Sequence, residues 1–231
     1  EAEGVEVFSS EVSADANQKA VQGAAAVLLG VKPYDILDVL ESLKDALGEE
    51  TVVISVAAGV SLDSLQKAAG KKQPVIRCMP NTPARVGKGA LAYSAGSTVT
   101  AEQRKLAEEI LGAVGMVFQV EEDQMDAVTA LSGSGPAYAF LLAECMKKAG
   151  MELGLDEELA KNLASTTVAG AGALLEKDPN PEDLRKAVTS PGGTTEQAIK
   201  AFQEGGIEEL TLRAMTANAQ KSAEMSQEYN K

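Results

Sequence analysis

The chain of 231 residues contains no histidine and no tryptophan, and aromatic residues make up only 3% of it. Because histidine is the commonest metal ligand and a frequent general base, zinc hydrolases and Ser-His-Asp hydrolases are disfavoured, and we expect no bound metal. Only two cysteines are present, Cys78 and Cys145. They offer neither the spacing of a metal site nor a disulfide framework, and two reduced thiols lead us to expect a cytoplasmic protein.

Basic side chains and long apolar runs are scarce as well. The formal net charge is −13, from 21 basic and 34 acidic residues, and such a surface repels nucleic acids and anionic lipids. No apolar run approaches the roughly 20 residues of a membrane-spanning helix, and we expect no signal peptide. We therefore expect no nucleic-acid partner and no membrane association. Apolar residues still make up 45% of the chain, enough for a folded core.

The first part of the chain alternates between short apolar segments and helical patterns. Residues 26–31 and 52–56 are almost continuously apolar, which is typical of strands buried on both faces of a parallel sheet. Further strands are expected at residues 5–7, 75–79 and 116–120. Helices are expected at residues 34–47, followed by Gly48 as a stop signal, and at residues 101–112, capped by Thr100. This alternation predicts a doubly wound α/β layer.

The strand pattern disappears after about residue 121, and the remainder predicts an all-α domain. We therefore divide the chain into a dinucleotide-binding domain, residues 1–120, and an all-helical domain, residues 121–231. One long helix, from Asp156 as its cap to residue 176, contains Ala-Gly-Ala-Gly-Ala at 169–173. A glycine inside a helix costs about 1 kcal/mol relative to alanine, so we expect close helix packing there, either within the chain or between subunits. The other helices are expected at residues 137–149, 181–188, 194–203 and 207–227.

Three neighbouring predicted strands end in polar or glycine-containing turns, at residues 30–33, 57–59 and 77–83. Ligands of open α/β sheets bind outside the carboxyl ends of the strands. We therefore expect a ligand at this rim of the sheet.

Two further segments combine glycine, proline and hydroxyl residues. Leu-Ser-Gly-Ser-Gly-Pro-Ala-Tyr at 131–138 predicts free N–H groups at a helix start, although an ordinary interdomain turn would need the same residues. Thr-Ser-Pro-Gly-Gly-Thr-Thr at 189–195 predicts a tight turn whose N–H groups suit a carboxylate. Thr194 and Gln197 have capping-box spacing, so a plain capped helix is the alternative. The hydroxyls of Ser190, Thr194 and Thr195 favour an anion site.

Four of these segments together resemble the motifs of Δ1-pyrroline-5-carboxylate reductases. They are Gly-Val-Lys-Pro at 30–33, Met-Pro-Asn-Thr-Pro at 79–83, Ser-Gly-Ser-Gly-Pro-Ala-Tyr at 132–138 and Ser-Pro-Gly-Gly-Thr-Thr at 190–195. The resemblance extends over about residues 17–219, and the last two motifs are the most specific. It implies a Rossmann-type α/β N-terminal domain, here partial, followed by an all-α dimerisation domain. It also implies the last step of proline biosynthesis, in which NAD(P)H transfers a hydride to L-1-pyrroline-5-carboxylate and L-proline is formed.

The resemblance also implies roles for individual residues. Thr195 matches the family position that hydrogen-bonds the substrate nitrogen, and it is the candidate catalytic residue and proton donor. Substrate binding falls to Ser190, Gly193, Thr194 and Thr195. Cofactor binding falls to Asn17, Val31, Lys32, Pro33, Ala57, Ala58, Gly59 and Asn81, with NADPH as the usual cofactor and NADH as the alternative. The family assembles through its helical domain into dimers, often into larger rings.

The sequence departs from the family pattern at its start. The family begins with a strand, a glycine-rich phosphate loop, a helix and a second strand, but no Gly-x-Gly-x-x-Gly precedes Val5. We therefore expect the sequence to be part of a longer protein, with residues 5–7 unpaired and an open sheet edge along residues 26–31.

Two other functions remain as alternatives. A related two-domain hydroxy-acid dehydrogenase would share the architecture, but it would place a lysine in its catalytic helix, and residues 131–138 and 190–195 contain none. A fragment unable to bind cofactor, which only oligomerises through its helical domain, is the second alternative.

Overall fold

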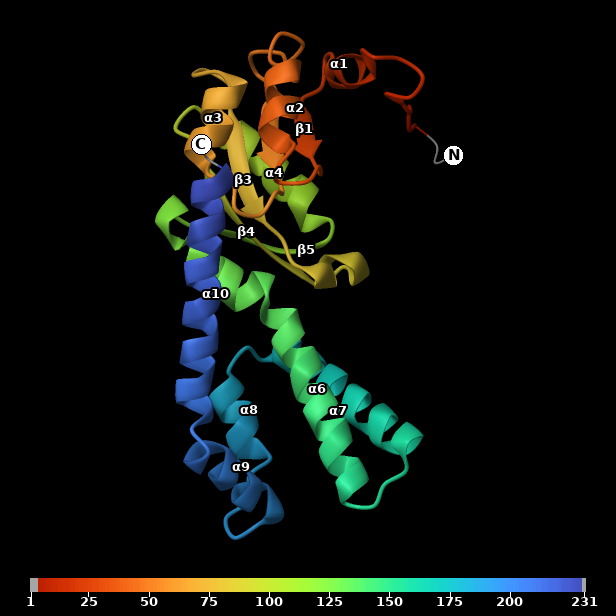
Figure 1. Ribbon diagram of the computed structural model, residues 1–231, viewed down its shortest axis with the longest axis vertical. Helices are drawn as coiled ribbons and strands as arrows, with labels where there is room; N and C mark the ends of the chain where they lie inside the picture. Colours follow the sequence, from red (N-terminus) through yellow and green to blue (C-terminus); the bar gives the residue numbers. More distant parts are fainter. Residues whose placement is uncertain (1–3, 230–231) are drawn as a thin grey trace. The chain divides into compact units, whose positions relative to one another are not determined.

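A five-stranded sheet forms the centre of the first part of the computed structural model, which describes residues 4–229 (Figure 1). The strands β1 (Ala26–Leu29), β2 (Val52–Ser55), β3 (Val75–Met79), β4 (Gly89–Ala95) and β5 (Gly115–Gln119) lie side by side in chain order. β1, β2 and β3 are mutually parallel, β4 is antiparallel to β3, and β5 is parallel to β4. The strands predicted at residues 26–31, 52–56, 75–79 and 116–120 are confirmed to within two residues.

The fifth predicted strand, at residues 5–7, is wrong. These residues form no regular element, and the side chains of Val5 and Val7 are 61% and 77% exposed. A three-residue strand is stable only when a neighbouring strand forms backbone hydrogen bonds with it. Among the described residues, no strand pairs with the outer edge of β1. The expected open edge along β1 is therefore confirmed, and half of the Leu28 side chain is exposed there.

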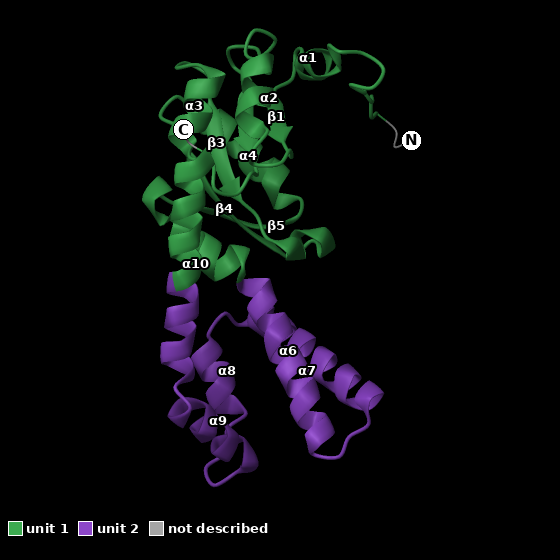
Figure 2. Ribbon diagram, viewed as in Figure 1, with its two compact units in different colours: residues 1–134, 217–231 green, residues 135–216 purple. Residues whose placement is uncertain are grey.

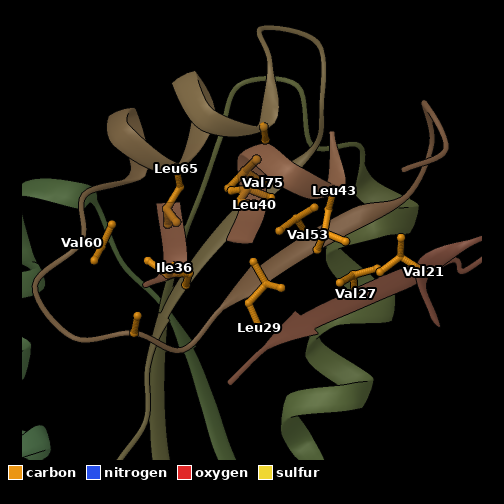
Figure 3. Close-up of a cluster of buried hydrophobic side chains, with 12 residues drawn as sticks. Val21, Val27, Leu29, Ile36, Leu40, Leu43, Val53, Val60, Leu65 and Val75 are labelled. Carbon is orange, nitrogen blue, oxygen red and sulfur yellow. The ribbon is translucent and has the colours of Figure 1, made fainter. Parts of the chain in front are cut away.

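Helices cover both faces of the sheet. On one face, α2 (Ile36–Leu43) and α3 (Leu62–Ala69) pack over a cluster that includes Val53, Leu40 and Leu65 (Figure 3). On the other face, α4 (Ala101–Gly112) packs over a cluster that includes Val52 and Ile54. Successive β2 side chains thus enter opposite layers, and all of β2 is buried. This confirms the expectation of a strand buried on both faces for residues 52–56. For residues 26–31 the expectation is wrong, because Val27 and Leu29 are buried but Leu28 is 49% exposed.

The helix caps show which local patterns hold. The predicted cap of α4 is present as a full capping box, because Thr100 Oγ1 accepts from the Gln103 N–H at 3.2 Å and Gln103 Oε1 accepts from the Thr100 N–H at 2.9 Å. α2 is shorter than the predicted 34–47.

Residues 4–120 also contain four elements that the sequence patterns did not predict. They are α1 (Ala16–Val21), α3, the 3-10 helix η1 (Thr82–Val86) and β4.

Residues 121–229 contain no strand, as predicted. They form η2 (Glu122–Gln124), α5 (Met125–Val128), the π-helix η3 (Thr129–Gly133), α6 (Gly135–Glu152), α7 (Glu157–Lys177), α8 (Pro181–Ala187), α9 (Thr194–Glu204) and α10 (Ile207–Tyr229). The predicted cap of α7 forms, with Asp156 Oδ1 accepting from the Leu159 N–H at 2.9 Å. Among residues 4–229, no helix combines the length and apolarity that crossing a membrane requires.

The chain forms two compact units (Figure 2). The sheet unit consists of the described residues up to Ser134 together with residues 217–229, and the helical unit consists of residues 135–216. Residues 121–134 and the end of α10 are therefore helical but belong to the sheet unit. The domain division after residue 120 stays a prediction.

The helical unit buries very little of its own apolar surface. Among residues 135–216, only Ala160 and Ala164 are buried. Large apolar side chains are exposed on several of its helices, including Phe140, Leu163 and Leu212. A surface of this kind marks an interaction site.

Candidate cofactor rim and substrate loop

The carboxyl ends of β1, β2 and β3 lie at one edge of the sheet, because these strands are parallel and paired in register. The loops that follow them carry Val31 to Pro33, Ala57 to Gly59, and Asn81. The structure therefore brings the predicted cofactor residues of all three loops to one rim, as the sequence analysis expected.

The first loop lines a hollow along the open edge of β1. This hollow, of about 360 Å³, is lined by Asn17 from α1 and by Gly30 and Val31, among others. Lys32 and Pro33 follow directly, and the Lys32 carbonyl accepts from the Asp35 N–H at 3.0 Å. Asn17 and Val31, which are distant in the sequence, thus share one surface.

The second loop is fixed at both ends. The Ala57 N–H donates to Ser55 Oγ at 3.3 Å, and Gly59 adopts a φ of +77°, which disfavours any residue with a side chain. Beyond the loop, the Leu62 N–H at the start of α3 donates to Glu122 Oε1 at 2.9 Å. The same oxygen pairs with Arg77 Nη1 at 2.6 Å. Glu122 thus joins η2, β3 and the start of α3.

The third loop is tied to the rest of the unit by the side chain of Asn81. Its Nδ2 donates to the Ser132 carbonyl at 3.0 Å, and its Oδ1 accepts from the Ala90 N–H at 2.9 Å. Both ends of the amide are therefore engaged with backbone groups. The predicted proximity of Asn81 to the nicotinamide stays a prediction.

The segment before Pro136 is a π-helix, η3, so the predicted turn at this point is wrong. The N–H of Ser134 donates to the Thr129 carbonyl at 2.9 Å, and Ser132 Oγ donates to the Val128 carbonyl at 3.1 Å. These groups, which the sequence analysis expected to be free, are occupied because the chain continues helically from α5. A Cβ added at Gly133 would lie 2.5 Å from Met79 Cε, so the flexible end of the Met79 side chain would have to move to admit a larger residue. Short π-helices occur frequently at functional sites.

Sequence analysis missed the contribution of α10 to this rim. A hollow of about 150 Å³ is lined from the rim side by Ala58, Gly59, Thr129 and Ser134, and from α10 by Asn218, Lys221, Ser222 and Met225. All of these residues belong to the sheet unit. The only sequence signal is the four-residue spacing of two small polar residues, Asn218 and Ser222, on a helix.

The predicted substrate loop lies in the helical unit. Its turn is closed by the Gly193 N–H, which donates to the Ser190 carbonyl at 3.0 Å, and Gly192 has a φ of +74°. Thr194 and Thr195 are the first two residues of α9, where N–H groups have no partner within the helix. The structure thus brings Ser190, Gly193, Thr194 and Thr195 together in one exposed turn.

The capping box predicted for this helix is wrong. Gly193, not Thr194, is the N-cap, and no side chain caps the helix. Glu196 instead reaches back, and its Oε2 accepts from the Gly192 N–H at 2.8 Å. Thr194 lies within the first turn of α9, and its hydroxyl does not cap the helix.

Another hollow of the described residues lies away from the predicted site. A hollow of about 700 Å³ at the opposite edge of the sheet is lined by Glu49, Glu50 and Glu102, among others, and by none of the predicted site residues. No three His, Cys, Asp or Glu side chains of the described residues could together hold a metal ion. Burial raises the pKa of the Cys78 thiol to about 12. Burial and the hydrogen bond to Glu108 raise the pKa of Tyr93.

Two protein families match this chain, and together they define its class. Residues 2–59 match the family described as NADP oxidoreductase, coenzyme F420-dependent, and residues 122–225 match pyrroline-5-carboxylate reductase dimerisation. A Rossmann-type sheet unit followed by a helical dimerisation region is the architecture of a two-domain NADP-dependent oxidoreductase.

The relatives then identify the family. A pyrroline-5-carboxylate reductase of Pseudomonas aeruginosa is 44% identical over 216 residues, which are 93% of this chain and 79% of that protein. A solved pyrroline-5-carboxylate reductase of Coxiella burnetii superposes with a TM-score of 0.87 at 44% identity, covering 91% of this chain and 79% of that one. The Plasmodium falciparum enzyme, solved with NADP bound, gives 0.79 at 30% identity, covering 91% and 80%. The chain belongs to the pyrroline-5-carboxylate reductase family, and the hydroxy-acid dehydrogenase alternative is not favoured.

Proposed function

We propose that this protein reduces L-1-pyrroline-5-carboxylate to L-proline with a hydride from NADPH. The observation that carries the proposal is the turn at residues 190–195. It places backbone N–H groups and the hydroxyls of Ser190, Thr194 and Thr195 at the start of α9. A helix N-terminus of this kind binds a carboxylate without an arginine, and the substrate carries one carboxylate.

In the proposed mechanism, the turn binds the substrate carboxylate through the N–H groups of Thr194 and Thr195 at the start of α9, because the Gly193 N–H already donates to the Ser190 carbonyl. The Thr195 hydroxyl hydrogen-bonds the ring nitrogen and holds the C=N bond in place. The bound cofactor supplies the hydride. As the new C–H bond forms at the C=N carbon, the π electrons of C=N move to the nitrogen. An imine that binds unprotonated takes its proton from the Thr195 hydroxyl, and solvent water returns a proton to the Thr195 oxygen. Positioning a substrate that is already electrophilic requires no histidine.

The rim of the sheet unit fits a dinucleotide. Its hollows are lined in part by small residues, among them Gly30, Ala58 and Gly59, which allow a ligand to approach the chain closely. We assign to cofactor binding Asn17 from α1, the two loop segments 31–33 and 57–59, and Asn81. The solved relative with NADP bound supports NADPH over NADH. The ratio of kcat/KM for the two cofactors tests this choice, and a higher value with NADH would reverse it.

The test of the substrate loop is the variant Thr195→Ala, assayed through the loss of NADPH absorbance with pyrroline-5-carboxylate. A hydrogen bond to a charged group contributes about 1.5–3 kcal/mol, so we expect kcat/KM to fall about 10- to 100-fold with the KM for NADPH unchanged. Thr195→Ser keeps the hydroxyl and should retain most activity. Thr211→Ala, a threonine of the same unit whose hydroxyl donates only to the Ile207 carbonyl, is the control. Wild-type kinetics in Thr195→Ala would remove Thr195 from the mechanism.

The same assay separates the proposal from its alternatives. Hydroxy acids offered with NADP should give no turnover. A cofactor titration should show saturable NADPH binding, whereas no binding at millimolar NADPH would favour a fragment that only oligomerises.

We further propose that the helical region assembles the protein into a dimer or a larger oligomer through α7. Added Cβ atoms at Gly170 and Gly172 would meet nothing within 4 Å in the chain itself, so packing within the chain does not explain these glycines. The match of residues 122–225 to a dimerisation family supports a second copy as the neighbour. We also propose a cytoplasmic location, supported by the two free thiols.

Sedimentation of Gly170→Leu and Gly172→Leu tests this assembly. Residues two apart on a helix differ by about 200° in direction, so the two variants serve as controls for each other. We expect at least one of them to dissociate the oligomer at concentrations where the wild type stays associated. Retention of the wild-type state by both would refute the role of α7.

A further inference from the structure

We propose that the end of α10, residues 217–229, is a brace that positions two loops of the cofactor rim for hydride transfer, with Asn218 and Ser222 as positioning residues. This inference rests on the proposed function for the role of loop 57–59 and the segment 132–134. The brace belongs to the same compact unit as both of them (Figure 2).

The first contact of the brace is with the π-helical segment. Asn218 Nδ2 donates to Ser134 Oγ at 2.8 Å. The backbone of Ser134 is held by Thr129, and the carbonyl of Ser132 is held by Asn81. Asn218 therefore adds a further anchor to this segment, and it is the one that comes from the far end of the chain.

The second contact is buried. Ser222 is the only buried residue of α10, with 6% exposure, and its hydroxyl donates to Asp126 Oδ1 at 2.6 Å. Asp126 lies in α5, directly before the π-helix. This hydrogen bond fixes the position of α10 along its own axis relative to α5, the helix that leads into the rim.

The third contact is with the loop after β2. An added Cβ at Gly59 would lie 3.3 Å from Tyr229 Cδ2 and 3.5 Å from Met225 Cβ. Tyr229 also packs against the hydrophobic cluster that contains Ala57 and Val60. The last two turns of α10 thus cover the glycine of this loop.

The contacting residues follow a single stripe of the helix. Asn218, Ser222, Met225 and Tyr229 are spaced by four, three and four residues, which places them on one face. The opposite face carries the exposed side chains of Glu224 and Gln227. One face of one helix therefore sets the distance between the two loops, and a small displacement of reacting groups lowers turnover strongly.

The experiment compares Asn218→Leu and Ser222→Ala with the wild type in the full chain. Asn218→Leu removes the hydrogen-bond donor to Ser134 and leaves a side chain of similar size. Asn218→Asp is the rescue variant, because the Ser134 hydroxyl can donate to the new carboxylate. Gln227→Ala, on the exposed face of the same helix, is the matched control. The first readout is the rate of amide hydrogen exchange in residues 56–60 and 131–135. The second is kcat, measured together with the kinetic isotope effect that NADPH deuterated at the transferred hydrogen produces.

We expect faster exchange in both segments of Asn218→Leu and Ser222→Ala. We also expect a roughly tenfold lower kcat, a larger isotope effect because hydride transfer becomes slower, and NADPH affinity within about twofold. Asn218→Asp should recover kcat to within about threefold, and Gln227→Ala should match the wild type.

Unchanged exchange in both segments overturns the brace, whether or not the enzyme is active. Faster exchange with unchanged kcat and isotope effect overturns its role in hydride transfer. A wild type that reduces no pyrroline-5-carboxylate overturns the proposed function and with it the link to hydride transfer. Faster exchange in the variants would then still support the brace as a device that holds the two loops.

Discussion

Removal of the Glu122 carboxylate should destabilise the sheet unit, because one oxygen of this side chain serves two partners. Glu122 Oε1 lies 2.6 Å from Arg77 Nη1 and 2.9 Å from the Leu62 nitrogen. The Arg77 side chain is only 6% exposed, whereas that of Glu122 is 35% exposed. In Glu122→Ala, the guanidinium would stay buried without its charge partner.

The expected magnitude lies between two limits. Breaking a fully buried ion pair costs about 3–5 kcal/mol, and a fully exposed pair contributes about 0–1 kcal/mol. Water can reach the Glu122 side and replace part of the lost interaction, while the unpaired Leu62 N–H adds about 1 kcal/mol. We expect a loss of about 2–3 kcal/mol in the free energy of unfolding.

Urea unfolding followed by circular dichroism measures this loss, since the chain has no tryptophan to report by fluorescence. Glu122→Gln keeps an acceptor for the Leu62 N–H and should cost only about 1 kcal/mol. The double variant Arg77→Met/Glu122→Leu removes both charges and should be more stable than Glu122→Ala. Asp123→Ala, an exposed carboxylate in the same 3-10 helix, is the control. A change below about 0.5 kcal/mol in Glu122→Ala, or strict additivity in the double variant, would refute this reasoning.

Three shorter predictions concern the fold. Gly115→Ala should lower stability by more than about 2 kcal/mol, because its Cβ would overlap the Gly89 carbonyl oxygen; thermal unfolding measures this, and near-wild-type stability would contradict the register of β4 and β5. Asp156→Ala should cost about 1 kcal/mol through loss of the cap on Leu159, and Asp156→Ser should recover most of it in the same measurement. Cys78 should resist alkylation up to about pH 9 in the folded protein, because burial raises the pKa of its thiol to about 12, and mass spectrometry should find it modified only after unfolding; modification of Cys78 in the native state would show that the sheet opens locally.

The parallel strands and the long helices could be predicted because their signals are local. The apolar run at residues 52–56 is buried on both faces, and Thr100 with Gln103 forms a capping box whatever packs around it. β4 was missed because its sequence, Gly-Ala-Leu-Ala-Tyr-Ser-Ala, contains no β-branched residue. It is a strand only because β3 and β5 lie on its two sides.

The candidate site was predictable where it follows from sheet topology and not where it depends on distant contacts. Parallel strands bring their carboxyl ends together, so the three rim loops could be expected at one edge. The contacts of Asn218 and Ser222 arise from tertiary packing of a helix almost 100 residues away in sequence from its partners. The wrong cap at Thr194 has a local origin instead, because the helix begins one residue earlier, with Gly193 as its N-cap, and Glu196 accepts from the Gly192 N–H of the turn.

The scarcity of buried side chains in the helical unit has a thermodynamic consequence. With only Ala160 and Ala164 buried among residues 135–216, the proposed assembly would supply much of the burial that stabilises these helices, because another copy would cover their apolar faces. Folding is then coupled to association and follows mass action, so the apparent melting temperature rises with protein concentration. Dilution alone should weaken the fold, and stabilities of variants are comparable only at equal concentration.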